Sequence, residues 1–215
     1  MKFERGASRL IDIILAITFI IILLPIMLII FLLIKLDSRG PVLFKQQRIG
    51  KDGEAFLILK FRTMIINSEQ KLKENPVLYR KYIENSYKLD PSEDPRITKL
   101  GEFLRKTSLD EIPQFLNVLI GDMSIVGPRP VLLDELKEYG NKREIFLSVK
   151  PGITGYWQVS GRSNIGYPER VNLELYYIER KNILFDISII GKTFISVLKK
   201  RELIKFKIKH ERIHC

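Results

Sequence analysis

The sequence predicts an α+β fold with an N-terminal membrane helix, a small cytoplasmic domain and amphipathic helices at the membrane surface. An uncharged apolar run at residues 13–34 predicts the membrane helix. Two apolar segments around a glycine-bounded turn at residues 50–53 predict a β-hairpin, and apolar side chains at helical spacing further on predict several helices. The expected divisions are a membrane helix, a domain with interfacial helices and a basic tail, at residues 1–36, 37–200 and 201–215.

Composition limits the class of protein and its partners. A chain of 215 residues suits a single domain with an appendage. Its 36 Lys and Arg against 25 Asp and Glu give a net charge of +11, which predicts an anionic partner such as nucleic acid, lipid head groups or a phosphorylated substrate. The only cysteine is Cys215, so an internal disulfide framework is excluded and a reducing compartment is indicated.

The apolar run is long enough to cross a bilayer. Its 22 residues include Thr18 as the only polar side chain, and as a helix they would extend roughly 33 Å against a hydrocarbon core of about 30 Å. Basic residues mark cytoplasmic flanks, and here they occur on both sides of the run, so both ends are expected in the cytoplasm. Pro25 removes a helical hydrogen bond. We therefore expect a re-entrant helix broken at Pro25, with Arg9 and Asp12 paired at its entry.

The segment after the run predicts the secondary structure of the domain. Residues 42–49 and 54–64 have the pattern of two strands, and alternation places Lys60 and Arg62 on one face. Residues 65–87 read as one charged helix, and a second helix is expected to follow Asp94-Pro95 and end at Lys106.

An acidic pair lies between two predicted helices. Ser108 and Glu111 have the spacing of a capping box for an apolar helix that ends at Gly121. Acidic residues in a first turn often only complement the helix dipole. The alternative is functional, because a helix N-terminus also collects phosphate and keeps a carboxylate ionised, so that Asp110 could attack phosphorus. Spacing alone leaves both interpretations open.

Two turn-rich segments follow. In Gly127-Pro128-Arg129-Pro130 an arginine is held between two prolines, which suits bidentate recognition of phosphate, although an ordinary tight turn has the same pattern. Residues 150–163 contain the only tryptophan, Trp157, and several glycines. Such a loop could stack a base or sugar and bind phosphate through backbone N–H groups.

The C-terminal region is basic and amphipathic. Residues 181–215 carry nine Lys and Arg against three Asp and Glu, with apolar side chains at helical spacing. This pattern indicates a helix on an anionic membrane surface, and the alternative is an amphipathic helix packed on the domain. The zinc-protease pattern H-E-x-x-H also occurs, at His210-Glu211-Arg212-Ile213-His214. We interpret this match as chance, because such a site needs a third ligand, commonly further along the chain, and only Cys215 follows.

Together these segments resemble the bacterial sugar transferase family, the monotopic polyprenol-phosphate phosphoglycosyl transferases, from Arg9 to about Lys200. The segments that carry the resemblance, in chain order, are the apolar run with Pro25, Gly40-Pro41-Val42-Leu43-Phe44, Lys60-Phe61-Arg62-Thr63-Met64, Asp94-Pro95-Arg96-Ile97-Thr98, Ser108-Leu109-Asp110-Glu111, Gly121-Asp122-Met123-Ser124, Gly127-Pro128-Arg129-Pro130 and residues 150–163. Their order and spacing outweigh the capping interpretation of Asp110. One departure is Leu24, where many members have serine before the membrane proline.

The resemblance implies a two-step reaction at the cytoplasmic face of the bacterial inner membrane. Asp110 matches the nucleophile that attacks a UDP-sugar and releases UMP, after which undecaprenyl phosphate takes the phosphosugar from the aspartyl intermediate. Glu111 matches the second catalytic residue and the Mg²⁺ ligand. The substrate-binding residues implied in this way are Lys60, Arg62, Arg105, Arg129, Gln158 and Arg162. The form of the loop around Trp157 favours galactose or glucose, and the reaction would begin a surface polysaccharide or glycoconjugate pathway.

Two other functions fit parts of the sequence. A glycosyltransferase that moves sugar without its phosphate would release UDP, and a non-catalytic basic scaffold could dock on anionic lipid. A nucleic-acid partner is not expected, because no recognition motif is present and the charge lies beside membrane elements. The sequence leaves open whether the chain forms homo-oligomers.

Overall fold

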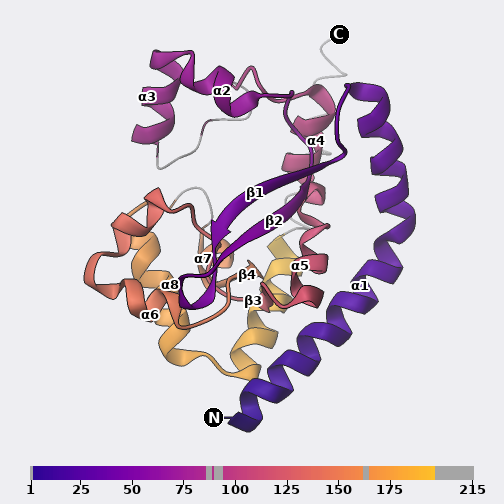
Figure 1. Ribbon diagram of the computed structural model, residues 1–215. Coiled ribbons are helices and arrows are strands. Elements are labelled where there is room, and N and C mark those ends of the chain that lie inside the picture. The colour runs from indigo at the N-terminus through magenta and orange to yellow at the C-terminus, as the bar shows by residue number, and fades with distance from the viewer. Residues whose placement is uncertain (1, 86–88, 90–93, 162–164, 197–215) are drawn as a thin grey trace, which may run out of the picture.

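A computed structural model of the chain describes residues 2–85, 89, 94–161 and 165–196. It is a mixed structure of helices and two small sheets, in which the long helix α1 (Lys2–Asp37) flanks the rest of the molecule (Figure 1). A long β-hairpin crosses the middle, α2 and α3 lie beyond one end of it, and α6 and α8 lie near its other end (Figure 1). The α+β class predicted from the sequence is confirmed.

The helix α1 is continuous from Lys2 to Asp37, with Pro25 inside it. The helix is therefore not interrupted at Pro25, although Figure 1 shows that α1 bends along its length. Proline removes a single backbone donor, and the helical pairing on either side carries the chain through. The part from Gly6 to Asp37 is apolar and long enough to cross a membrane, and in its most apolar stretch only 11% of the residues are buried.

Both ends of α1 are attached to the folded domain. Near the N-terminal end, Arg9 donates to the carbonyls of Val118 (2.6 Å) and Leu119 (3.0 Å). Asp12 accepts hydrogen bonds from the Ser124 hydroxyl (2.8 Å) and the Ile125 amide (2.9 Å). The predicted pairing of Arg9 with Asp12 is replaced by these contacts, because carbonyl and amide groups of the domain lie closer to each side chain.

The other end of α1 is held by Arg62. Its guanidinium donates to the carbonyls of Ser38 (2.7 Å) and Arg39 (2.5 Å), at the end of the helix, where carbonyls lack helical partners. Apolar contacts accompany these bonds, since Ile30 and Ile34 are buried in a cluster with Leu104 and other side chains of the domain.

The predicted hairpin is confirmed. β1 (Leu43–Ile49) and β2 (Ala55–Phe61) pair antiparallel, with Leu43 opposite Phe61 and Ile49 opposite Ala55. A short 3₁₀ turn, η1 (Lys51–Gly53), joins them, and Asp52 adopts a left-handed conformation within it. Ile58 and Phe61 of β2 are buried in separate core clusters.

Two helices replace the single one expected at residues 65–87. α2 (Ser68–Lys73) and α3 (Pro76–Glu84) are separated at Asn75, whose side chain accepts a hydrogen bond from the Leu78 amide and so caps α3. Proline in the first helical position starts a helix rather than continuing one. α4 (Lys99–Thr107) was predicted correctly and begins at the cap residue Thr98.

The remaining elements build the second half of the domain. β3 and β4 pair parallel, and α1 and α5 contact β3. In chain order the elements are η2 (Leu109–Glu111), α5 (Gln114–Ile120), β3 (Ser124–Val126), η3 (Asp134–Lys142), α6 (Arg143–Leu147), β4 (Gly152–Thr154), α7 (Tyr156–Ser160) and α8 (Glu169–Arg180). The predicted end of α5 at Gly121 is confirmed, with this glycine at φ 107°.

Residues 183–196 form a further helix. Ile189 is fully buried in the core, whereas Ile187 and Phe194 are more than half exposed. This helix therefore packs on the domain and also presents apolar side chains outward. The remainder of the predicted amphipathic region, the basic tail at 201–215 and the H-E-x-x-H segment lie outside the described residues.

Candidate active site

The position of Asp110 is set by a close approach between α4 and the segment that follows β2. A Cβ on Gly101 would lie 2.0 Å from the carbonyl oxygen of Thr63, so only glycine allows α4 to pack against this backbone. One turn later, Arg105 Nε donates to the Thr63 hydroxyl at 2.9 Å. α4 then ends at Ser108, which has a left-handed conformation (φ 59°), and the chain turns into η2. Asp110 and Glu111 lie in this turn.

The capping box predicted at Ser108 is not formed. Ser108 ends α4 and makes no side-chain cap for the following turn. The helix α5 begins at Gln114, four residues after Asp110. Its N-terminus therefore does not hold the Asp110 carboxylate in the way the sequence suggested.

Burial dominates the electrostatics of Asp110. The residue is 7% exposed. Burial raises the pKa of its carboxyl to about 6, while Lys60 lowers it, Glu111 raises it and Arg105 lowers it. A helix N-terminus was expected to favour the ionised form of this carboxyl, whereas burial raises its pKa. At neutral pH Asp110 is ionised but far more basic than an ordinary aspartate, which suits a nucleophile.

Glu111 is paired with the strand β2. Lys60 Nζ lies 2.7 Å from its carboxylate, and the Glu111 side chain is about one third exposed. Lys60 therefore contacts one member of the acidic pair and acts electrostatically on the other. Within the described ranges, no cluster of three or more potential metal-binding side chains occurs. A metal ion here would need most of its ligands from substrate and water.

Arg105 and Arg129 bring positive charge to the acidic pair. The pKa of Arg105 is lowered, chiefly by burial, although the negative charges of Asp110 and Asp94 oppose the shift. Arg129 is close enough to Arg105 to lower that pKa further. Arg105 thus acts directly on Asp110, and Arg129 adds positive charge near Arg105, which would attract an anionic substrate.

Arg62 has a different place. Its guanidinium is buried and donates to the carbonyls of Ser38 and Arg39, directly after α1, and a Cβ on Gly40 would lie 2.2 Å from its Nη1. Alternation was expected to put Arg62 beside Lys60, but β2 ends at Phe61 and Arg62 follows the strand. Its hydrogen bonds make it a support for the end of α1.

The Gly-Pro-Arg-Pro segment follows β3, and glycines allow its backbone to pack closely against β4 and the residue after it. A Cβ on Gly152 would lie 2.1 Å from the amide nitrogen of Gly127, and one on Gly155 would lie 2.1 Å from the Gly127 carbonyl oxygen. The Gly152 amide donates to the Pro128 carbonyl at 2.9 Å. At least this backbone donor of the 150–163 loop pairs with the chain rather than being directed at a ligand.

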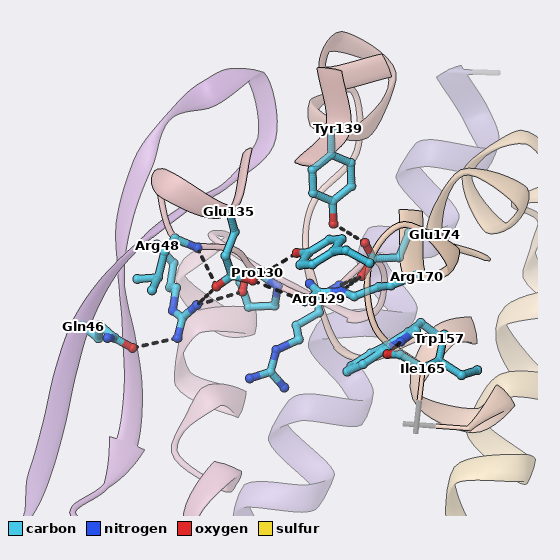
Figure 2. Close-up of polar contacts among 12 residues, drawn as sticks. Gln46, Arg48, Arg129, Pro130, Glu135, Tyr139, Trp157, Ile165, Arg170 and Glu174 are labelled. Atoms are coloured by element: carbon cyan, nitrogen blue, oxygen red, sulfur yellow. Dashed lines mark hydrogen bonds and ion pairs between the residues drawn. The ribbon is translucent and has the colours of Figure 1, made fainter. Parts of the chain in front are cut away.

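Below this segment lies a buried network of charges (Figure 2). The Glu174 carboxylate accepts from the Arg129 amide at 3.1 Å, from Arg170 at 3.2 Å and from the Tyr139 hydroxyl. Arg170 also reaches Glu135 at 3.2 Å, and Figure 2 shows the Arg129 side chain extending away from this network. The Arg129 backbone is therefore anchored in the network, whereas its guanidinium lies outside it, 5.9 Å from the centre of the Trp157 ring.

Arg48 of β1 extends the network to the hairpin. It donates to Glu135 at 3.1 Å and to Gln46 at 2.8 Å (Figure 2). Burial alone would raise the pKa of Glu135, but the charges of Arg170 and Arg48 outweigh it, so the pKa is lowered. Glu135 therefore stays ionised, and it compensates the arginines that converge here.

Three expected features of the 150–163 loop have different outcomes. Trp157 is 3% exposed, its Nε1 donates to the Ile165 carbonyl, and Arg170 lies over its ring, so it offers no open face for a base or sugar. Gln158 has a buried Oε1 without a hydrogen-bond partner in the described part of the chain, and no described contact joins it to Asp110. Arg162 lies outside the described residues.

The sequence did not reveal the residues that support Arg129. Arg170 and Glu174 lie four residues apart on α8, a spacing typical of an exposed helical ion pair, yet both are almost fully buried. Glu135 and Arg48 gave no signal at all, because their partners are 35 and 87 residues away. The only hint that Arg170 and Glu174 are buried was that they are near the apolar residues Tyr167 and Val171 at helical spacing.

The site and the fold together define a class. A buried aspartate beside a partly exposed glutamate, with lysine and arginine around them and an exposed apolar helix nearby, is typical of a membrane-associated enzyme for a phosphorylated substrate.

Comparisons with known proteins then give the family. A family model described as bacterial sugar transferase matches residues 3–200. The undecaprenyl-phosphate galactose phosphotransferase of Salmonella typhimurium is 43% identical over 93% of this chain and 42% of its own length. The exopolysaccharide production protein ExoY of Sinorhizobium fredii is 41% identical over 91% of this chain and 87% of its own length. The chain belongs to the bacterial sugar transferase family.

The similar proteins differ in length. The UDP-glucose:undecaprenyl-phosphate glucose-1-phosphate transferase of Escherichia coli is 41% identical over 90% of this chain but only 41% of its own length. The chain thus spans about two fifths of the Salmonella and Escherichia proteins and most of the Sinorhizobium protein.

Proposed function

We propose that the protein transfers a phosphosugar from a UDP-sugar to undecaprenyl phosphate and releases UMP, through a covalent intermediate on Asp110. The observation that carries this proposal is the buried Asp110 carboxyl, with a pKa of about 6, beside Lys60, Glu111 and Arg105. A carboxylate this basic, surrounded by cations, suits attack on a phosphate group.

Each step can be written from the residues present. In the first step, an Asp110 oxygen attacks the sugar-bearing phosphorus, the bond from that phosphorus to the bridging oxygen breaks, and UMP leaves with the electron pair. Positive charge from Lys60, Arg105 and Arg129 reduces the repulsion between the carboxylate and the diphosphate. In the second step, an oxygen of the lipid phosphate attacks the same phosphorus and Asp110 leaves as a carboxylate.

Glu111 is the residue we propose for Mg²⁺. Magnesium in such sites is bound by one or two carboxylates together with substrate phosphates, and the partly exposed Glu111 beside Asp110 fits this pattern. Lys60, which donates to the Glu111 carboxylate in the structure, would then share that carboxylate with the ion. When bound, the ion would neutralise part of the diphosphate charge.

For the membrane, we propose that both ends of α1 lie on the cytoplasmic side of the bacterial inner membrane. Arg9 and Asp12 contact α5 and β3, and Ile30 and Ile34 pack with α4, so one folded domain holds both ends. The outward apolar face of α1 and the exposed side chains of residues 183–196 would contact lipid, and the basic composition favours an anionic surface.

The donor sugar is proposed from the relatives. Their names specify galactose or glucose as the transferred group and, for ExoY, exopolysaccharide production. We infer a UDP-linked hexose of this kind and a role at the first membrane step of surface polysaccharide synthesis.

UMP release tests this proposal. Purified protein with Mg²⁺, undecaprenyl phosphate and either UDP-galactose or UDP-glucose should form UMP, and chelation of the ion by EDTA should stop it. Release of UDP instead would indicate a glycosyltransferase that moves sugar alone. No nucleotide release with any UDP-sugar would favour a non-catalytic scaffold, although that function does not explain the acidic pair of Asp110 and Glu111.

A further inference from the structure

A cavity of about 410 Å³ lies between the start of β1 and the segment that follows β2. Its volume is in the range of small-molecule pockets. The residues around it are Pro41, Leu43, Phe44, Lys45, Arg62, Thr63, Met64, Ile65, Ile66, Asn67, Ser68 and Arg105. Half of these side chains are apolar, three are cationic and none is acidic.

This combination restricts the occupant. The neutral polar side chains are Thr63, Asn67 and Ser68, and the apolar half of the wall would leave many hydroxyls of a sugar or polar edges of a base unpaired, at a cost in desolvation. Lys45, Arg62 and Arg105 favour an anion. Because Arg62 is already bonded to the end of α1, Arg105 and Lys45 are the cations left to meet a phosphate. A single phosphate on an apolar chain fits both properties.

The cavity connects the candidate active site with the membrane helix. At its inner side, Arg105 belongs both to the cavity wall and to the charges that act on Asp110. At its outer side, Ile66 lies against Gly40, just beyond the end of α1, and is about half exposed. An isoprenyl chain could therefore reach the cavity from the lipid around α1.

We propose that this cavity is the acceptor subsite, which binds the phosphate and the adjoining isoprene units of the lipid substrate. The proposal rests on the proposed function and adds to it a location for the second substrate. Bound here, the lipid phosphate directs one oxygen at the phosphorus carried by Asp110. The new phosphorus–oxygen bond forms as the bond to Asp110 breaks, the carboxylate takes the electron pair, and the product is a polyprenyl diphosphate sugar.

Filling the cavity tests the proposal. Ile66→Trp places an indole at the half-exposed rim, where the fold tolerates a larger side chain. The matched control is Ile145→Trp on α6, since Ile145 is an isoleucine of similar exposure, 47% against 49%, and does not line the cavity. Both variants are assayed in detergent with a short-chain polyprenyl phosphate, so that insertion into a bilayer plays no part.

Two readouts separate donor from acceptor. With UDP-sugar and Mg²⁺ alone, wild type, Ile66→Trp and Ile145→Trp should give the same burst of UMP. With acceptor added, Ile66→Trp should show a KM for the lipid phosphate raised about tenfold or more, while Ile145→Trp keeps the wild-type value.

An unchanged lipid KM in Ile66→Trp, or an equal rise in Ile145→Trp, would overturn the subsite. Loss of the UMP burst in Ile66→Trp alone would overturn it too, because the cavity would then serve the donor. Failure of the proposed function looks different: wild type itself would release no UMP, and the subsite would fall with it.

Discussion

The Asp110 carboxyl must lose its proton before it can attack phosphorus, and its pKa of about 6 places that event near neutral pH. The rate of UMP release in a single turnover should therefore be low at pH 5, rise through about pH 6 and level off above it. Lys60→Met removes a charge that lowers this pKa, so the midpoint should move to higher pH. Rapid-quench measurements from pH 5 to 8 check this; a profile without a slope, or a midpoint unmoved in the variant, would contradict it.

The arginines should separate into two groups by their effects. Arg129→Ala should lower turnover by about two to three orders of magnitude, as the loss of a transition-state charge partner does elsewhere, and Arg129→Lys should also be impaired because it lacks the planar fork. Thermal stability should change little, because the network below is held through the Arg129 backbone.

Arg62→Ala provides the contrast. Its loss leaves carbonyls at the end of α1 without partners, so we expect about 2 kcal/mol of destabilisation. Thermal unfolding in detergent, measured beside turnover for both arginine variants, separates support from catalysis. Equal stability losses in Arg129→Ala and Arg62→Ala would contradict the division.

At this scale the sequence predicted which residues matter better than what each one does. Asp110, Glu111, Lys60 and Arg105 do lie together, and Arg129 lies near Arg105. The capping box failed because the same three-residue spacing also fits a helix C-terminus followed by a tight turn. Nothing in local spacing distinguishes these, since the difference is the left-handed conformation of Ser108.

Among the elements, those with strong local signals were predicted well. The hairpin, α4 and α5 each have apolar periodicity and turn or cap residues at their ends. Residues 65–87 were expected as one helix, although Asn75-Pro76 has the pattern of a new N-terminus. At Pro25 an interruption was predicted, whereas the helix continues through the proline and bends along its length.

The attachment of α1 makes a prediction about topology. In a variant without Cys215, single cysteines introduced near Lys2 and near Lys35 should both resist a membrane-impermeant thiol reagent applied to intact cells. The physical reason is that Arg9 and Asp12 bind the N-terminal end to the domain that also holds the C-terminal end.

A matched variant sharpens this experiment. With Arg9→Ala and Asp12→Ala combined, the N-terminal end loses these bonds, and we expect part of the population to label near Lys2. Labelling near Lys2 in the otherwise unaltered chain would contradict the same-side arrangement.

In the whole molecule, the feature least accessible to sequence is the buried network under Gly-Pro-Arg-Pro. It joins Arg48 of β1, Glu135 of η3 and Glu174 of α8, which are separated by up to 126 positions and meet only through the tertiary fold. Such buried charges persist only when they are paired, so the network fixes the Arg129 loop in one arrangement. The resemblance indicated which residues form the site, and the structure shows the buried charges that hold the Arg129 loop in place.

The central claim is that Asp110 carries the phosphosugar between the two substrates, and the mass of the intact protein tests it most directly. Protein incubated with UDP-sugar and Mg²⁺, without lipid, should gain the mass of one phosphosugar as UMP appears in equal amount, and added lipid phosphate should remove it. Asp110→Asn, which keeps the shape but loses the charge, should show neither. An adduct that persists in Asp110→Asn, or product formed with lipid while no adduct is ever detected in the wild type, would contradict the account.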